Sequence, residues 1–185
     1  MKKLLLFCAG YYLLLSCNNQ PAASAPAATK DSMTVNKPAS TPPSEFADGR
    51  YVDMGKKQLA ALSSGDMNAW LAPFADSAVF HWSGGDSLAG KEAITKYWTE
   101  RRGKVIDSIS FSLDIWLPLK VNKPQQGPDM PGVWLLSWYK VNVKYKNGKK
   151  LTFWVHTDQH YNNNDKIDVL VQYIDKAPIN KALGK

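Results

Sequence analysis

The clearest pattern along the chain is an alternation of polar and apolar side chains in its second half. From residue 108 to residue 116, serine and aspartate alternate with isoleucine, phenylalanine and leucine, which is typical of a strand with one buried face. Three later segments, 133–145, 150–161 and 166–174, also have strand character and are separated by turn-forming residues. The pattern predicts a meander of four antiparallel strands.

The residues before this meander have helical periodicity instead. Apolar side chains recur at near-helical spacing from Tyr51 to Leu62, and the pattern ends at Gly65. Asp66 is placed as the N-cap of a short second helix, and a third helix is predicted over residues 91–101. Helices followed by strands favour an α+β fold, with three N-terminal helices packed in the concave face of a strongly curved antiparallel sheet.

The turn Asn147-Gly148 allows the side chains of the two longest strands to be sorted by face. If it is a two-residue hairpin loop, Tyr139 lies opposite His156, and Ser137 lies opposite Asp158. These residues then share one face with Trp154, and its aromatic and aliphatic character is that of a pocket lining. The opposite face, with Trp134 and Trp138, would be solvated or would form a homodimer. A longer loop would exchange the two faces.

His156, Asp158 and His160 alternate along one predicted strand, and three interpretations of them are open. A shared metal ion is disfavoured, because positions i and i+4 of a strand lie about 13 Å apart, and a third ligand such as His81 would be needed. His156 oriented by Asp158 could instead act as an acid–base pair. A structural role for the pair is favoured over catalysis, since neighbouring histidine and carboxylate groups often do no more than form a hydrogen bond with each other. We predict no metal and no cofactor.

Three stretches resemble the SnoaL-like proteins of the NTF2-like superfamily. They are GDMNAWLAPFADSAVFHW, LAGKEAITKYW and KIDVLVQYID, and the likeness extends from Phe46 to about Lys176. The resemblance implies a cone whose interior binds apolar molecules. Superfamily enzymes such as polyketide cyclases and ketosteroid isomerases use pocket aspartates, tyrosines or histidines, but no catalytic residue matches one by one. The closing turn, Asn164-Asp165-Lys166, lacks the family's usual glycine.

The N-terminus has the features of an export signal. Lys2 and Lys3 precede an apolar run over residues 4–16 that is too short to span a membrane. Its end, Leu14-Leu15-Ser16-Cys17, resembles the bacterial lipobox, which implies that Cys17 becomes the first mature residue and is acylated. Two or more acyl chains anchor a protein stably in a bilayer. Asn18 is not the aspartate that retains such proteins in the inner membrane, which favours the outer membrane, facing the periplasm.

The chain is thus expected to have four parts. A signal peptide occupies residues 1–17, and an Ala/Pro/Ser-rich tether with no aromatic residue occupies residues 18–44. The SnoaL-like domain is expected over residues 45–178, followed by a C-terminal tail, 179–185.

Charge and cysteine content exclude several function classes. The net charge of +7 comes from 23 basic and 16 acidic residues in short scattered clusters, so we expect attraction to anionic lipids rather than nucleic acid. With Cys17 acylated and Cys8 removed, no free thiol remains for disulfides or nucleophilic catalysis. The stretch GDSLAGK fits the phosphate-binding loop pattern, but Glu92 replaces the required Ser or Thr, so nucleotide binding is rejected.

The sequence therefore predicts a lipid-anchored, exported lipoprotein that binds a small, partly apolar ligand in its cone. The expected ligand-binding residues are Tyr139, Trp154, His156 and Asp158, with His81 and Trp98 as outer candidates. The alternatives are an acid–base enzyme (an isomerase, cyclase or hydrolase using His156 and Asp158) and a dimeric interaction module. Enzymatic activity is not the favoured interpretation.

Overall fold

The computed structural model describes residues 40–124 and 130–185, and residues 40–185 form one compact unit. The predicted signal peptide, Cys17 and the tether up to residue 39 lie outside the described residues. The helices and strands are β1 (Ser44–Phe46), α1 (Arg50–Ser64), α2 (Met67–Leu71), β2 (Phe74–Trp82), β3 (Ser87–Ala89), α3 (Lys91–Glu100), the π-helical turn η1 (Arg101–Val105), β4 (Ile106–Val121), β5 (Gly132–Tyr145), β6 (Lys150–Tyr161), β7 (Ile167–Tyr173) and α4 (Ala177–Leu183).

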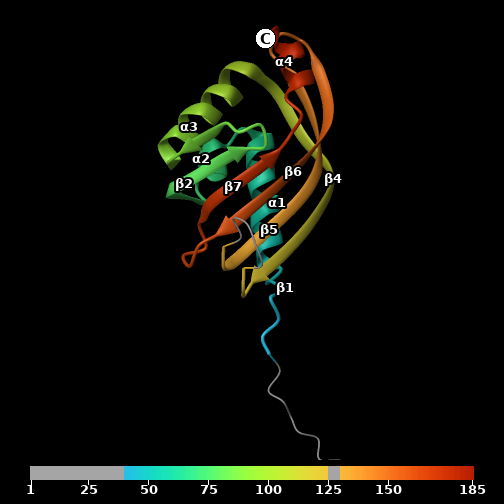
Figure 1. Cartoon of the computed structure of the whole chain (residues 1–185). Helices are drawn as coiled ribbons and strands as arrows, with labels where there is room; N and C mark the ends of the chain where they lie inside the picture. Colours follow the sequence, from blue (N-terminus) through green and yellow to red (C-terminus); the bar gives the residue numbers. More distant parts are fainter. Residues whose placement is uncertain (1–39, 125–129) are drawn as a thin grey trace, which may run out of the picture. The chain divides into compact units, whose positions relative to one another are not determined.

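The described strands form one sheet in the order β1-β4-β5-β6-β7-β2-β3 (Figure 1). Strands β4 to β7 are the predicted antiparallel meander. The expectation of a purely antiparallel sheet is wrong, because β2 pairs in parallel with β7. The last strand of the chain, β7, lies between β6 and the much earlier strand β2, so the sheet is mixed at this side. The predicted tether also ends slightly earlier than expected, since β1 begins at Ser44 and pairs with β4.

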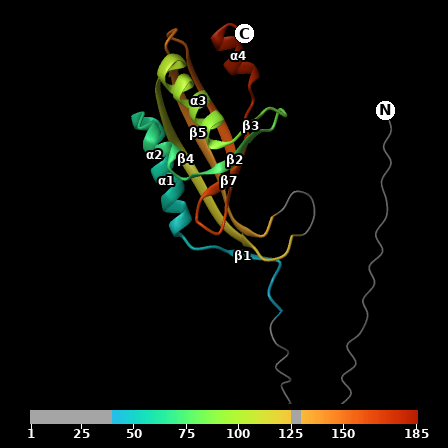
Figure 2. The same ribbon diagram turned by 90° about the vertical axis from the view of Figure 1, so that its left-hand side faces the viewer.

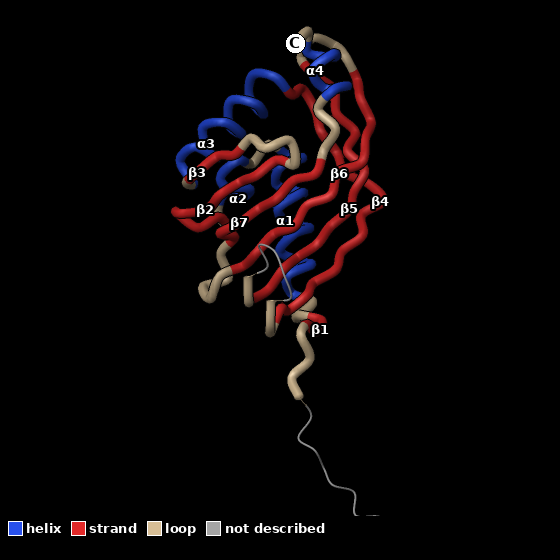
Figure 3. Tube along the Cα trace, in the orientation of Figure 1, coloured by secondary structure: helices blue, strands red, loops and turns tan. Residues whose placement is uncertain are grey.

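Helices α1, α2 and α3 cover one face of this sheet (Figure 2). Helix α1 crosses the sheet on the far side of the strands in the view of Figure 3 and packs on β4 and β5, whereas α3 packs on β2. Asp66 caps α2 as predicted, accepting a hydrogen bond from the Ala69 backbone N–H at 2.9 Å. The α+β architecture is therefore confirmed, with a fourth helix, α4, after the sheet.

Gly55 brings α1 into close contact with the sheet. A Cβ atom at this position would lie 2.4 Å from Trp116 Cζ3 and 2.8 Å from Leu135 Cδ2. A glycine inside a helix costs about 1 kcal/mol relative to alanine, and here it is retained because no side chain fits between the two layers. Trp116 in turn stacks on Tyr139, with 6.4 Å between the ring centroids.

The β5–β6 hairpin corrects the predicted register. Its loop has three residues, not two: Tyr145 N donates to Lys149 O at 2.8 Å, and Gly148 adopts a φ of 83°. A three-residue loop with a left-handed glycine is a common hairpin alternative. Tyr139 consequently pairs with Val155 rather than with His156. Because side chains alternate along a strand, this shift of one residue moves every β6 side chain to the opposite predicted face.

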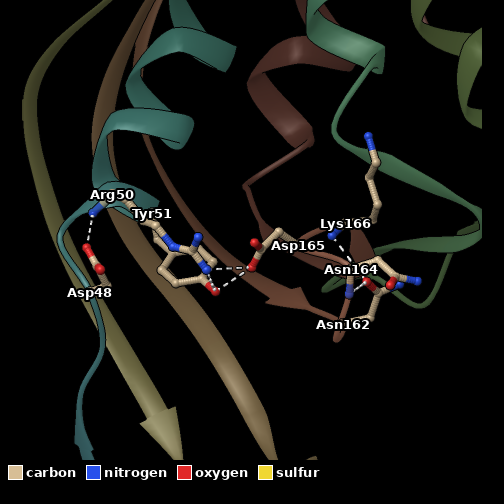
Figure 4. A network of polar contacts seen from close by, with 7 residues as sticks. All are labelled: Asp48, Arg50, Tyr51, Asn162, Asn164, Asp165 and Lys166. Atoms are coloured by element: carbon tan, nitrogen blue, oxygen red, sulfur yellow. Dashed lines mark hydrogen bonds and ion pairs between the residues drawn. The ribbon is translucent and has the colours of Figure 1, made fainter.

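The closing turn before β7 holds the start of α1 (Figure 4). Asp165 Oδ1 accepts hydrogen bonds from the Tyr51 hydroxyl at 2.6 Å and from Arg50 Nη2 at 2.9 Å. Asp165 has a φ of 54°, a conformation that aspartate tolerates better than most residues. Asn162 Oδ1 accepts from the backbone N–H groups of Asn164 and Lys166. Side-chain hydrogen bonds thus stabilise the turn that lacks the usual glycine.

Candidate ligand-binding cavity

A cavity of about 290 Å³ lies between the helix-covered face of the sheet and the helices α3 and α4. The sheet contributes aromatic and aliphatic side chains from β4, β5 and β6, among them Phe111, Tyr139, Val141 and Val155. These are the side chains that alternation directs to the inner face. A smaller extension reaches toward α1 and α2 and shares Trp98, Tyr139 and Gln172 with the main cavity. The walls are therefore mostly apolar, as in small-molecule pockets.

Tyr139 is the central polar group of the cavity. Its side chain is 5% exposed, and burial raises the pKa of its phenol to about 12, although hydrogen bonding with Thr157 and Gln172 partly opposes this. Gln172 is itself oriented, because its Oε1 accepts a hydrogen bond from Trp82 Nε1 at 3.0 Å. At neutral pH the phenol therefore keeps its proton, so it can donate a hydrogen bond to a ligand but is a poor base.

Trp98 Nε1 is a buried donor with no hydrogen-bond partner among the described residues. The side chain extends from α3, is 7% exposed, and lines both the cavity and its extension. Leaving a buried N–H unpaired costs about 1–3 kcal/mol.

The rim of the cavity carries charged side chains. Arg101, from η1, is half-buried, and its guanidinium lies 6.0 Å from the centroid of the Tyr97 ring. Lys176 pairs with Asp86 and places its ammonium 4.7 Å from the centroid of the Trp82 ring. Burial raises the pKa of Tyr145, another lining phenol, while nearby Arg101 lowers it. Asp86 is thus already neutralised, whereas Arg101 has no carboxylate partner among the described residues.

Helix α4 closes one end of the cavity. Ile179 is 5% exposed and packs with the inner side chains of β5 and β6, and Leu183 also lines the cavity. The helix is fixed by a hydrogen bond from Asn147 Nδ2 to Ala182 O at 2.9 Å. The sequence analysis assigned residues 179–185 to a tail. The apolar spacing of Ile179, Ala182 and Leu183, with Pro178 at the helix start, is the signal that could have revealed this wall.

Of the six predicted ligand-binding residues, the structure places Tyr139 and Trp98 in the cavity and the other four elsewhere. Trp154, His156 and Asp158 lie on the outer face of β6, because of the hairpin register, and Trp154 is 51% exposed. His81 alternates with the buried Phe80 and Trp82 on β2 and so also faces outward. The prediction that Tyr139 shares a face with His156 and Asp158 is therefore wrong.

The predicted contact between His156 and Asp158 is nevertheless present on that outer face. Nε2 of His156 lies 2.8 Å from Asp158 Oδ1, and Nδ1 lies 2.9 Å from Ser137 O. The imidazole is stacked between Trp138 and Tyr173, at 4.4 and 5.1 Å between ring centroids. Burial raises the pKa of Asp158, and His156 partly opposes this. Both ring nitrogens of His156 therefore lie within contact distance of protein oxygens.

The third residue of that motif, His160, forms a separate pair. Its Nδ1 lies 2.6 Å from Asp168 Oδ1, and its Nε2 lies 3.1 Å from Pro131 O. The two histidines of β6 therefore contact different carboxylates. Within residues 40–124 and 130–185, no three His, Cys, Asp or Glu side chains are grouped in a way that could hold a metal ion.

Comparison with known proteins agrees with the fold. Residues 56–117 match the family model of the SnoaL-like domain. Similar solved structures include an LEH-like epoxide hydrolase from M. tuberculosis, with a TM-score of 0.53 and 16% identity over 71% of this chain and 87% of that one. An NTF2-like protein of unknown function from Burkholderia pseudomallei has a TM-score of 0.56 and 13% identity over 72% and 97% of the two chains.

A third similar structure is a protein with a ketosteroid isomerase-like fold from Catenulispora acidiphila, solved in complex with trimethylamine. Its TM-score is 0.51, with 13% identity over 71% of this chain and 92% of that one. No curated protein gives a significant match. The described unit therefore has the NTF2-like fold, with a SnoaL-like match across its first half. At these identities the likeness shows the fold alone.

Proposed function

We propose that this chain is a membrane-anchored, exported lipoprotein whose NTF2-like domain binds a small, partly apolar ligand in its cone. The observation that carries the proposal is the cavity of about 290 Å³, whose lining is mostly apolar and aromatic and includes Trp98 and Tyr139. An apolar cavity with a few polar groups fits a molecule with an apolar body and a polar end.

The composition of the cavity wall favours binding over proton transfer. Among the described residues, the lining contains no histidine and one acidic side chain, Asp86, which pairs with Lys176 at the rim. The raised pKa of Tyr139 disfavours a phenolate base at neutral pH. The pair formed by His156 and Asp158, which would serve an acid–base enzyme, lies on the other face of the sheet. Among the described residues, the predicted acid–base pair therefore does not line the cavity.

The cavity can be tested with the chain expressed from Asn18 onward, which contains the whole compact unit. Native mass spectrometry should show an added organic mass that disappears on denaturation, or the protein should bind apolar probes that carry a carbonyl group.

A variant of the cavity wall gives the second test. Tyr139→Phe should weaken probe binding by about tenfold, which corresponds to the free energy of one hydrogen bond. The matched control is Tyr173→Phe, on the outer face. Equal weakening by both variants would contradict the assignment of the cavity face. The same spectra test the predicted homodimer.

The anchor is supported by the lipobox-like stretch ending at Cys17 and by the tether composition. Within the described residues no helix has the length and apolar character to cross a bilayer. Metabolic labelling with an alkyne-tagged fatty acid should label the wild-type chain and leave Cys17→Ala unlabelled. Density-gradient separation of the two membranes should place the labelled protein in the outer membrane. An unlabelled wild-type chain would exclude the anchor without affecting the cavity.

A further inference from the structure

Arg101 differs from the other two arginines of the chain in having no hydrogen-bond or ion-pair partner for its side chain among the described residues. Arg50 forms an ion pair with Asp165 at 2.9 Å. Arg102 donates hydrogen bonds to Leu62 O and Ser63 O at 3.2 and 3.3 Å, at the C-terminal end of α1. Within residues 40–124 and 130–185, Arg101 lies over the Tyr97 ring and near the Tyr145 phenol, and it forms no ion pair. A guanidinium without a carboxylate partner can bind an anion through charge-assisted hydrogen bonds.

The local backbone directs this guanidinium to the cavity. Helix α3 ends in the π-helical turn η1, in which Ile106 N donates to Arg101 O. Short π-helical segments inside helices are often found at functional sites. Tyr97, one turn before Arg101, packs against Trp82 and Trp98, and all three rings line the cavity. Arg101 is therefore positioned at the edge of an aromatic wall.

The same wall is poorly suited to a cationic ligand. Aromatic faces attract cations, but the protein's own cations already lie over two of these rings. Lys176 lies over Trp82, and Arg101 lies over Tyr97. The carboxylate of Asp86, which could bind a cation at the rim, pairs with Lys176. Among the described residues that line the cavity, Arg101 and Lys185 carry positive charges with no ion-pair partner, and Arg101 is the one placed against the aromatic wall.

We propose that the ligand is a small apolar acid whose carboxylate binds Arg101. This inference rests on the proposed function, because it requires a ligand in the cavity. The apolar body lies against Phe111, Val141 and Val155, and the anionic end lies at the rim, where it neutralises the guanidinium. A planar guanidinium binds a carboxylate through two parallel hydrogen bonds, which makes the head group a determinant of specificity.

Three probes with one apolar chain and different head groups test the proposal: octanoate, octanol and octyltrimethylammonium. Calorimetric titration of the chain expressed from Asn18 should show octanoate binding about 10- to 100-fold more tightly than octanol, with octyltrimethylammonium weakest. Arg101→Gln should lower the affinity for octanoate to about the affinity for octanol. Lys104→Gln is the matched control, because this lysine is in the same turn but its side chain is 76% exposed and pairs with Glu100.

Equal binding of octanoate and octanol to the wild-type chain would overturn the inference, as would an octanoate advantage that persists in Arg101→Gln. Octanol binding that is weakened by Tyr139→Phe, without any preference for octanoate, would leave the cavity function standing and exclude the acid. Absence of binding for all three probes would overturn both proposals together.

Discussion

Replacing Gly55 by alanine tests whether α1 packs on the sheet as closely as the structure shows. The added methyl group would lie 2.4 Å from Trp116 Cζ3 and 2.8 Å from Leu135 Cδ2, so the aromatic ring or the helix must move. Overpacking of this kind costs about 1–3 kcal/mol, and the better helix propensity of alanine returns about 1 kcal/mol. The expected result is a net destabilisation of up to about 2 kcal/mol.

The displacement should also reach the cavity. Trp116 stacks on Tyr139, so a movement of the indole away from the new methyl group pushes the phenol inward. Thermal unfolding followed by circular dichroism should show a Tm lower by up to about 8 °C, together with weaker binding of cavity probes. Gly103→Ala is the control, since a methyl group there meets nothing within 4 Å. A Gly55→Ala variant more stable than the wild type would refute the close packing of α1.

Three further predictions concern a cap, a buried phenol and the C-terminal helix. Asp66→Ala, which removes the cap of α2, should lower the free energy of unfolding by about 1 kcal/mol in urea titrations. Burial raises the pKa of Tyr139 to about 12, so this phenol loses its proton at a higher pH in the folded state than in the unfolded state. The free energy of unfolding should therefore fall as the pH rises from 10 to 12, and it should fall less steeply in Tyr139→Phe. Ile179→Ala should lower the free energy of unfolding by about 2 kcal/mol, as measured by thermal unfolding, and should weaken probe binding. A loss of stability near zero would contradict the packing of α4 against the cavity.

The elements of the fold could be predicted because each has a local signal. The alternation over residues 108–116, the spacing from Tyr51 to Leu62 and the cap at Asp66 depend only on neighbouring residues. The parallel pairing of β2 with β7 has no such signal. This pairing joins two segments that lie far apart in the sequence, and it depends on the tertiary structure rather than on neighbouring residues.

The candidate site was harder to predict because one turn decides it. Asn147-Gly148 suits a two-residue loop, but Lys146 joins the loop and Gly148 takes the left-handed conformation at its end. The loop is therefore one residue longer than predicted, and each β6 side chain lies on the face of the sheet opposite to the predicted one. Tyr139 kept its predicted place because it was assigned on β5, whose inner face is also marked by the apolar Leu135 and Val141.

The central claim is that ligands contact the inner face of the sheet and not the outer one, and indole NMR tests it most directly. In nitrogen-15-labelled protein each tryptophan gives an Nε1–H signal, which Trp98→Phe and Trp154→Phe variants would assign. On titration with octanoate, the account predicts a large shift of the Trp98 signal, since this indole lines the cavity, and an unchanged signal for the exposed Trp154. A shift at Trp154 with Trp98 unchanged would contradict it.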